Sequence, residues 1–230
     1  IRFEHCVSYP TVESRQKNWD HATPATAIFN VLRRVNSGYL QLYSLSTHSD
    51  IIDWRHPDIL DCAKTLVAGH QPPTAIAQTC FEWMRDTIRH SIGYQMNPIT
   101  CRASDILIIK PAVTVAILFG HAKSRLLAAL LRANGIPAGL CYQRLSIHDK
   151  GAPYCLHRLT AIYLPQTDGY HIDARGNRPG VNAQFSPPCE HLTFRLHWLG
   201  EAGFAPIFAR PSAIVTEGYK PRLTGQRYCK

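Results

Sequence analysis

The order of helix-like and strand-like patterns constrains the fold of this chain more than any other feature. Apolar residues recur at helical spacing in residues 57–69, 74–90 and 121–134. Three β-like runs follow, separated by turn-forming sequences, over residues 139–145, 155–164 and 170–173. Helices that precede consecutive strands predict an α+β domain in which an antiparallel sheet packs on a central helix.

The helix over residues 121–134 is the clearest of these elements. Gly135 suits a left-handed cap at its end, and Pro137 follows where the helix cannot continue. Gly120 stands at its beginning, after a long apolar segment. Nearer the N-terminus, the alternation in residues 39–46 (YLQLYSLS) predicts an additional strand.

Composition and charge narrow the class of protein. The chain has 230 residues, 45% hydrophobic and 18% charged, which is ordinary for a globular protein with a sizeable core. Its most apolar segment, residues 106–119, is interrupted by Lys110 and Pro111, so we expect no membrane span. The formal net charge of +9 comes from scattered Lys and Arg without a basic run. That pattern favours an acidic protein partner or an anionic substrate and disfavours a nucleic-acid surface.

The cysteines indicate a compartment. There are 8 of them, spread over the whole chain with no C-x-x-C pair. Several lie in apolar patterns, as Cys80 does beside Phe81, which is typical of buried free thiols. We therefore expect reduced cysteines and a cytoplasmic protein rather than a disulfide framework.

Two polar residues in the strand region could carry chemistry. Residues two apart on a strand share a face, so His157 lies on an otherwise apolar face with Leu159 and Ala161. Asp173 ends the next run, where its carboxylate could orient an imidazole. The backbone N–H groups at the start of the 121–134 helix could lower the pKa of a thiol or hold an oxyanion. Taken alone, a strand His and a later Asp are weak signals, and such residues are more often satisfied polar groups in a core.

Five longer segments resemble the transglutaminase-like cysteine enzymes, particularly their bacterial branch. They read CFEWMRDTIRHS, CRASDIL, AKSRLLAALLRANGIPAGLCYQRL, PYCLHRLTAIYLP and IDARGNRPGVNAQFSPPCEHLTF, and they fall within residues 51–194. The resemblance implies a papain-like α+β core. In that core a cysteine begins a central helix, a histidine lies on a following strand, and an aspartate on the next strand orients the histidine.

The resemblance also implies a reaction and a domain organisation. His157 in CLHRL would be the general acid/base and Asp173 in IDARGN its orienter. Members of the family make or break amide bonds through a thioester, so we expect an acyltransferase or amide hydrolase that acts on a small-molecule or peptide substrate and needs no cofactor. Some relatives act on substrates tethered to acidic carrier proteins, which the net charge of +9 would suit. The expected single domain has an N-terminal extension (1–50), a core (51–195) and a C-terminal extension (196–230).

The chain departs from the family at the nucleophile. Gly-His-Ala-Lys-Ser, residues 120–124, stands where the bacterial branch has a pattern like Cys-Tyr-Ala-Lys-Ser, and Gly120 has no side chain that could attack a carbonyl. The chain could be a degenerate relative that keeps the fold for binding, or one that uses His157 and Asp173 for acid-base chemistry in another reaction. Alternatively the nucleophile is relocated, to Cys155 on the face of His157 or to Ser124 one helical turn after Gly120.

A metal site is the third account of the missing nucleophile. His121 would join His157 and Asp173 as ligands, but the histidines of this chain show no metal-binding spacing, and we assign no metal ligand. We expect His121, Ser124 and Arg175 to contribute to substrate binding. Arg175 could clamp an anionic group or pair within the core. His171 is expected to be structural.

Overall fold

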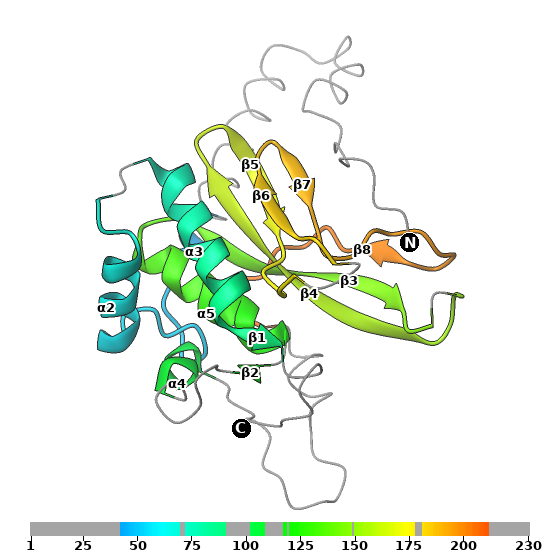
Figure 1. Ribbon diagram of the computed structural model, residues 1–230, viewed down its shortest axis with the longest axis horizontal. Helices are drawn as coiled ribbons and strands as arrows, with labels where there is room; N and C mark the ends of the chain where they lie inside the picture. Colours follow the sequence, from blue (N-terminus) through cyan, green and yellow to red (C-terminus); the bar gives the residue numbers. More distant parts are fainter. Residues whose placement is uncertain are drawn as a thin grey trace, which may run out of the picture.

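Helices on one side and an antiparallel sheet on the other make up this protein, as a computed structural model shows (Figure 1). The structure describes residues 42–69, 72–90, 102–108, 117–118, 120–148, 150–177 and 181–211. The fold is α+β, with the helices first in the chain and the long strands after them. The elements are α2 (Pro57–Leu66), α3 (Pro73–Thr87), β1 (Arg89–His90), α4 (Ala103–Ile108), β2 (Ile117–Leu118), α5 (Gly120–Ala133), β3 (Ala138–Ser146), β4 (Tyr154–Leu164), β5 (Thr167–Ile172), β6 (Gln184–Ser186), β7 (Cys189–His191) and β8 (Ala202–Gly203).

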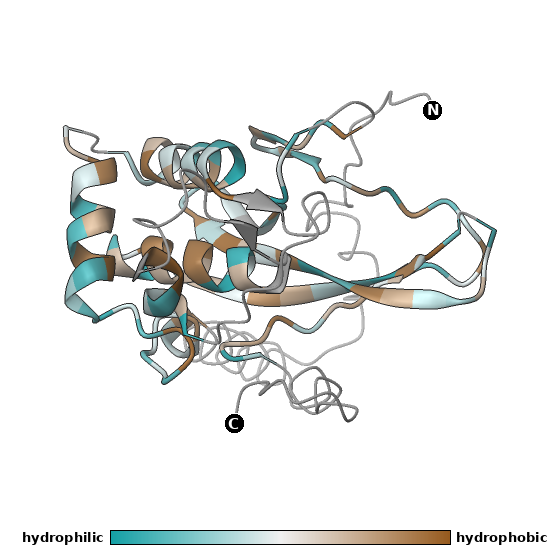
Figure 2. Ribbon diagram, turned by 60° about the horizontal axis from the view of Figure 1, so that its bottom comes forward, coloured by the Kyte–Doolittle hydropathy of each residue, from teal (hydrophilic) through white to brown (hydrophobic). Residues whose placement is uncertain are grey.

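The main sheet has the strand order β5-β4-β3-β8. Its centre is the long β3–β4 hairpin, which is antiparallel in continuous register from the pair Ala138↔Ile162 to the pair Ser146↔Tyr154. The outer end of this hairpin extends beyond the helices (Figures 1 and 2). Because successive side chains of a strand point to opposite faces, alternate residues of β3 and β4 lie on the two faces of the sheet.

Helix α5 contacts both layers of the fold. It packs on β3 and β4 and also on α2, α3 and α4. Because residues 126–131 are all buried, this stretch needs apolar side chains on every side, which its Leu and Ala residues supply. The helix ends as its sequence predicts. Gly135 has a φ of 75°, and the amide of Ile136 donates to the carbonyl of Leu131 at 2.9 Å, a left-handed cap that only glycine adopts without strain.

Near its C-terminal end, α5 also carries a buried charged side chain. Arg132 of α5 is buried, and its guanidinium donates to the carbonyl oxygens of Ala138, Thr47 and Ala209 at 2.7 to 2.9 Å. Satisfying its donors with carbonyl groups offsets the cost of burying the cation. Arg132 thereby ties the end of α5 to β3 and to two loops.

The outer helices are amphipathic and begin with proline. Pro57 and Pro73 occupy the first turns of α2 and α3, where a missing N–H costs nothing. Figure 2 shows that both helices carry hydrophilic and hydrophobic positions. Their apolar stripes meet α5 in the main core, which includes Ile59, Phe81 and Met84. None of the helices described is long and apolar enough to cross a membrane.

The segments before and after the core were expected to be a strand over residues 39–46 and a C-terminal extension over residues 196–230. The strand predicted over residues 39–46 is wrong where it can be compared, because residues 42–44 form a helical turn and Leu45 is buried. Alternation over so few residues is a weak signal for a strand, because a short helical turn can bury one leucine equally well. From the expected C-terminal extension, β8 pairs with β3, and Phe208 exchanges backbone hydrogen bonds with Leu140.

The cysteines require a correction. Cys62, Cys80, Cys141 and Cys155 form no disulfide bond, but Cys189 is disulfide-bonded. The expectation of reduced thiols came from cysteines in apolar patterns, and it suits the buried Cys80 and Cys141. Cys189 instead lies half-buried in the short β7 strand, so the burial argument does not extend to it.

Candidate active site

His157 lies in β4, opposite Gln143 of β3. Its side chain is 13% exposed, and its ring meets the ring of Phe194 edge-on with centroids 5.0 Å apart. The face that carries His157 also carries Leu159 and Ala161, which form a small apolar cluster with Cys141. That cluster is separate from the main core that α5 fills.

Asp173 follows directly after β5 and faces His157. Its Oδ2 lies 2.8 Å from Nε2 of His157, and its Oδ1 accepts the backbone N–H of Arg175 at 3.2 Å. The carboxyl group is almost fully buried, with only 5% of the side chain exposed. The two residues that the sequence paired as acid/base and orienter are therefore in direct contact.

The electrostatics of the pair fix its protonation pattern. Burial alone would raise the pKa of Asp173, but the charge of His157 and its hydrogen bond outweigh burial, so the pKa is lowered. Asp173 is then an ionised acceptor near neutral pH, and Nε2 of His157 carries the hydrogen between them. Nδ1 makes no hydrogen bond to any residue that the structure describes. This nitrogen can take up a proton.

The side chain of Arg175 lies near the His157–Asp173 pair. Its guanidinium lies over the ring of Phe194, 4.8 Å from the ring centroid. Phe194 thus contacts both the His157 ring and the Arg175 side chain. The positive charge of Arg175 also contributes to lowering the pKa of Asp173.

A buried lysine joins the pair to helix α5. Lys123 is 1% exposed, and its Nζ donates to the carbonyl oxygens of Ile88 and Arg175, the latter at 2.9 Å. Burial lowers the pKa of Lys123 from 10.5 to about 7, and the negative charges of Asp173 and Asp86 oppose this only in part. The sequence analysis assigned Lys123 no role. Its signal was a lysine on a helix whose other residues are mostly apolar.

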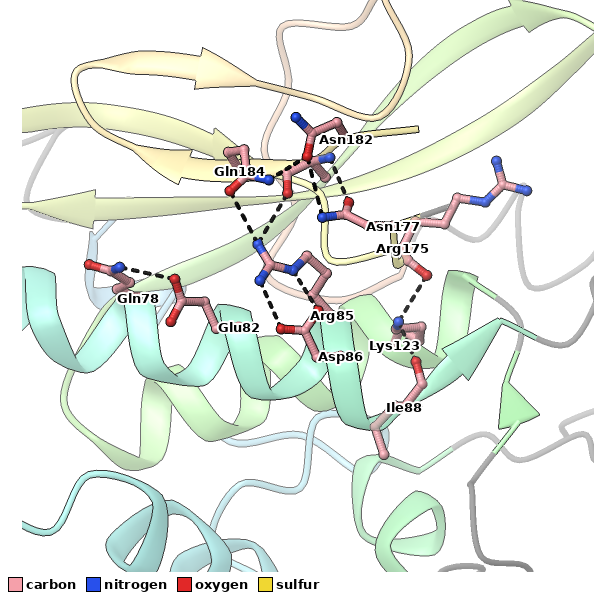
Figure 3. Close-up of polar contacts among 11 residues, drawn as sticks. Gln78, Glu82, Arg85, Asp86, Ile88, Lys123, Arg175, Asn177, Asn182 and Gln184 are labelled. Carbon is pink, nitrogen blue, oxygen red and sulfur yellow. Dashed lines mark hydrogen bonds and ion pairs between the residues drawn. The ribbon is translucent and has the colours of Figure 1, made fainter. Parts of the chain in front are cut away.

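A polar network holds the segment after Asp173 against helix α3 (Figure 3). Arg85 pairs with Asp86 at 2.7 Å and donates to the carbonyl of Ala183 at 3.2 Å. Asn177 accepts the N–H of Ala183 at 2.8 Å. Side-chain hydrogen bonds to the backbone of Ala183 therefore link this residue both to the end of α3 and to Asn177.

The residues proposed as nucleophiles are placed differently from one another. Gly120 is the first residue of α5, as the sequence predicts. Ser124 is buried in that helix, with 8% of it exposed. Cys155 is exposed on β4, two residues before His157 and on the same face of the strand. Of the two relocated candidates, Cys155 is the accessible one.

The remaining predicted residues contribute less. The side chain of His121 lies outside the described residues. No group of three His, Cys, Asp or Glu side chains that could hold a metal ion occurs in the part of the chain that the structure describes. His171, expected to be structural, lies 2.8 Å from Glu190 through its Nδ1.

Gln143 is a second residue that the sequence analysis missed. It is 3% exposed, and its Oε1 is buried without a hydrogen-bond partner among the described residues. As the cross-strand neighbour of His157, its side chain lies on the same face of the sheet. A lone Gln in an apolar strand was its signal, but only the strand register connects it with His157.

Comparison with known proteins gives little further detail. No family model matches the sequence, and no curated protein matches it. A solved structure described as "a Putative Cysteine Protease from Cytophaga hutchinsonii" is similar with a TM-score of 0.46 and 15% sequence identity. The match covers 58% of this chain and 42% of that one, so this chain spans less than half of the neighbour's length.

Proposed function

We propose that this chain is an amide-processing or acyl-transfer protein of the papain-like, transglutaminase-like kind, with His157 as general acid/base and Asp173 as its orienter. The observation that carries the proposal is the 2.8 Å contact between a partly exposed imidazole and a buried carboxylate. This arrangement leaves Nδ1 of His157 as the basic nitrogen. Paired groups of this kind are used to activate a nucleophile and to protonate a leaving group.

The accessible thiol of Cys155 is the proposed nucleophile. It gives its proton to Nδ1 of His157, and the sulfur attacks the carbonyl carbon of an amide substrate. The amine leaves with that proton, and a thioester to Cys155 remains. Water or a second amine, deprotonated by His157, then attacks the thioester and releases the acyl group and the thiol.

The substrate is a small-molecule or peptide amide, and an acidic carrier protein is its proposed partner. The net charge of +9 supports this choice, because it attracts an acidic surface over long range. Binding of this kind weakens as salt screens the charges. An affinity for an acidic carrier that does not change between low and high salt would contradict the proposed partner.

A non-catalytic binding module is the second candidate function. Gly120 favours it, since the start of α5 carries no side chain that could act as a nucleophile. In that case the His157–Asp173 pair would orient a bound ligand through Nδ1, and no covalent intermediate would form. The two candidates differ in whether a thiol near the pair reacts with an acyl electrophile.

Labelling with an electrophilic amide or thioester probe, followed by mass spectrometry of peptides, separates the candidates. The enzyme predicts an adduct on Cys155 that is strongly reduced by His157→Gln. Cys62, which is half-buried and forms no disulfide bond, provides the matched control thiol, and Cys62→Ala should leave the Cys155 adduct unchanged. No adduct on any thiol would favour the binding module. An adduct on Cys155 that is indifferent to His157→Gln would remove Cys155 from the mechanism.

A further inference from the structure

We infer that Lys123 is a positioning residue for the His157–Asp173 pair, acting through the backbone of Arg175. The inference rests on the proposed function for the importance of that pair, but not for its test. Lys123 touches neither the imidazole nor the reacting thiol. Its effect passes through Arg175, whose carbonyl oxygen accepts from Lys123 and whose N–H donates to Asp173.

The chain of hydrogen bonds is continuous. Nζ of Lys123 donates to the carbonyl of Arg175 at 2.9 Å, and the N–H of Arg175 donates to Oδ1 of Asp173 at 3.2 Å. Oδ2 of Asp173 in turn accepts from Nε2 of His157 at 2.8 Å. Holding the Arg175 carbonyl therefore restrains the residue that fixes one carboxylate oxygen and leaves the other to align the imidazole.

The backbone is shaped to meet the lysine. Gly176 has a φ of 113°, a conformation that residues with a side chain rarely adopt. A Cβ there would lie 3.8 Å from Nζ of Lys123 and 3.4 Å from the carbonyl oxygen of Arg85. The chain thus turns immediately after Arg175, close beside the buried amine and the end of α3.

The other end of the lysine contact is also anchored. Its second acceptor, the carbonyl of Ile88, ends helix α3, and Arg85 of that helix binds the carbonyl of Ala183 (Figure 3). Burying an amine is costly, and an aliphatic side chain would fill the same space without that cost. What the amine adds is two directed bonds, one to α3 and one to the backbone beside Asp173.

Proton NMR of the 230-residue chain tests the inference without turnover. The hydrogen on Nε2 of His157 should give a downfield resonance, assigned by its loss in His157→Gln. Lys123→Met should accelerate exchange of this hydrogen with water by about tenfold, because the Arg175 carbonyl loses its donor and the segment opens more often. Lys123→Arg should restore slow exchange. Lys123→Gln, which retains a donor, serves if the methionine variant does not fold and should accelerate exchange less.

Two controls separate positioning from general destabilisation. The hydrogen on Nδ1 of His171, paired with Glu190 at 2.8 Å, lies in the same sheet and should exchange as before. Arg132→Met removes another buried cation bound to carbonyl groups. It should leave the exchange rates of both histidine hydrogens unchanged. Equal acceleration of both histidine hydrogens, or an unchanged His157 hydrogen in the lysine variants, would overturn the inference. Because the signal does not depend on catalysis, an inactive protein with the expected exchange would refute the proposed function alone.

Discussion

The strongest prediction concerns the pH dependence of stability conferred by Lys123. Its pKa in the folded protein is about 7, below the ordinary value of 10.5 that it regains on unfolding. Between these values the unfolded chain binds more protons than the folded one. The free energy of unfolding must therefore rise with pH across this interval, and Lys123→Met should abolish that rise.

The size of the effect follows from linkage. With one proton released on folding, the slope approaches about 1.4 kcal/mol per pH unit in the middle of the interval. Near pH 7 the folded lysine is half protonated, so the gain from pH 7 to 8.5 is about 1.5 kcal/mol. Burial also raises the pKa of Cys80 and of Cys141, but these thiols oppose the trend only as pH approaches their ordinary value of 9.0.

Urea unfolding at pH 7.0 and 8.5 measures this difference. The wild type should gain about 1.5 kcal/mol relative to Lys123→Met between the two pH values. Arg132→Met is the matched control, since burial lowers the pKa of Arg132 only to about 10 and leaves it charged at both pH values. That variant should be destabilised yet keep the wild-type pH dependence. Equal pH dependence of the wild type and Lys123→Met would refute the assignment of a neutral-range pKa to this lysine.

Three more substitutions test individual features. Asp173→Asn should flatten the acid limb of the stability curve, because a carboxyl group with a lowered pKa stabilises the fold above its unfolded value of 3.8 and loses that contribution as pH falls; an unchanged acid limb would contradict the pairing. Gln143→Leu should raise the free energy of unfolding by about 1 kcal/mol, measured in urea, since it removes a buried acceptor without a donor; a loss would mean that the oxygen is satisfied. Gly135→Ala should cost about 1 kcal/mol through its left-handed backbone alone, because none of the residues that the structure describes would crowd the new methyl group, and calorimetry showing no change would contradict the cap.

The sequence predicts the elements better than it predicts their contacts. The helix over residues 121–134 and the strand over residues 155–164 have strong periodicity and marked ends, and they coincide with α5 and β4 to within about one residue. The weak alternation in residues 39–46 gave a strand where residues 42–44 form a helical turn. A local sequence pattern predicts structure reliably only where it agrees with tertiary packing. Here the buried side chain of Leu45 packs in the core from a segment that is not a strand.

The candidate site could be predicted only for residues whose positions follow from regular strands. His157 and Asp173 were singled out from strand alternation and from the resemblance. The structure has their side chains 2.8 Å apart, and their catalytic roles stay a prediction. Lys123 and Phe194 could not be assigned, because their positions depend on how α5 and the chain after β7 approach the end of β5. Gln143 needed the register of β3 and β4, which no single-strand pattern contains.

The use of Arg175 has a consequence for how this region can vary over evolution. Both bonds that tie it to the carboxylate and to the helix are made by its peptide groups, and its guanidinium is engaged elsewhere, over an aromatic ring. These two bonds therefore do not depend on which side chain stands at position 175, whereas the stacking on Phe194 and the contribution to the lowered pKa of Asp173 do require the arginine. Among all substitutions, only proline would remove the bond to the carboxylate, because it has no amide hydrogen to offer.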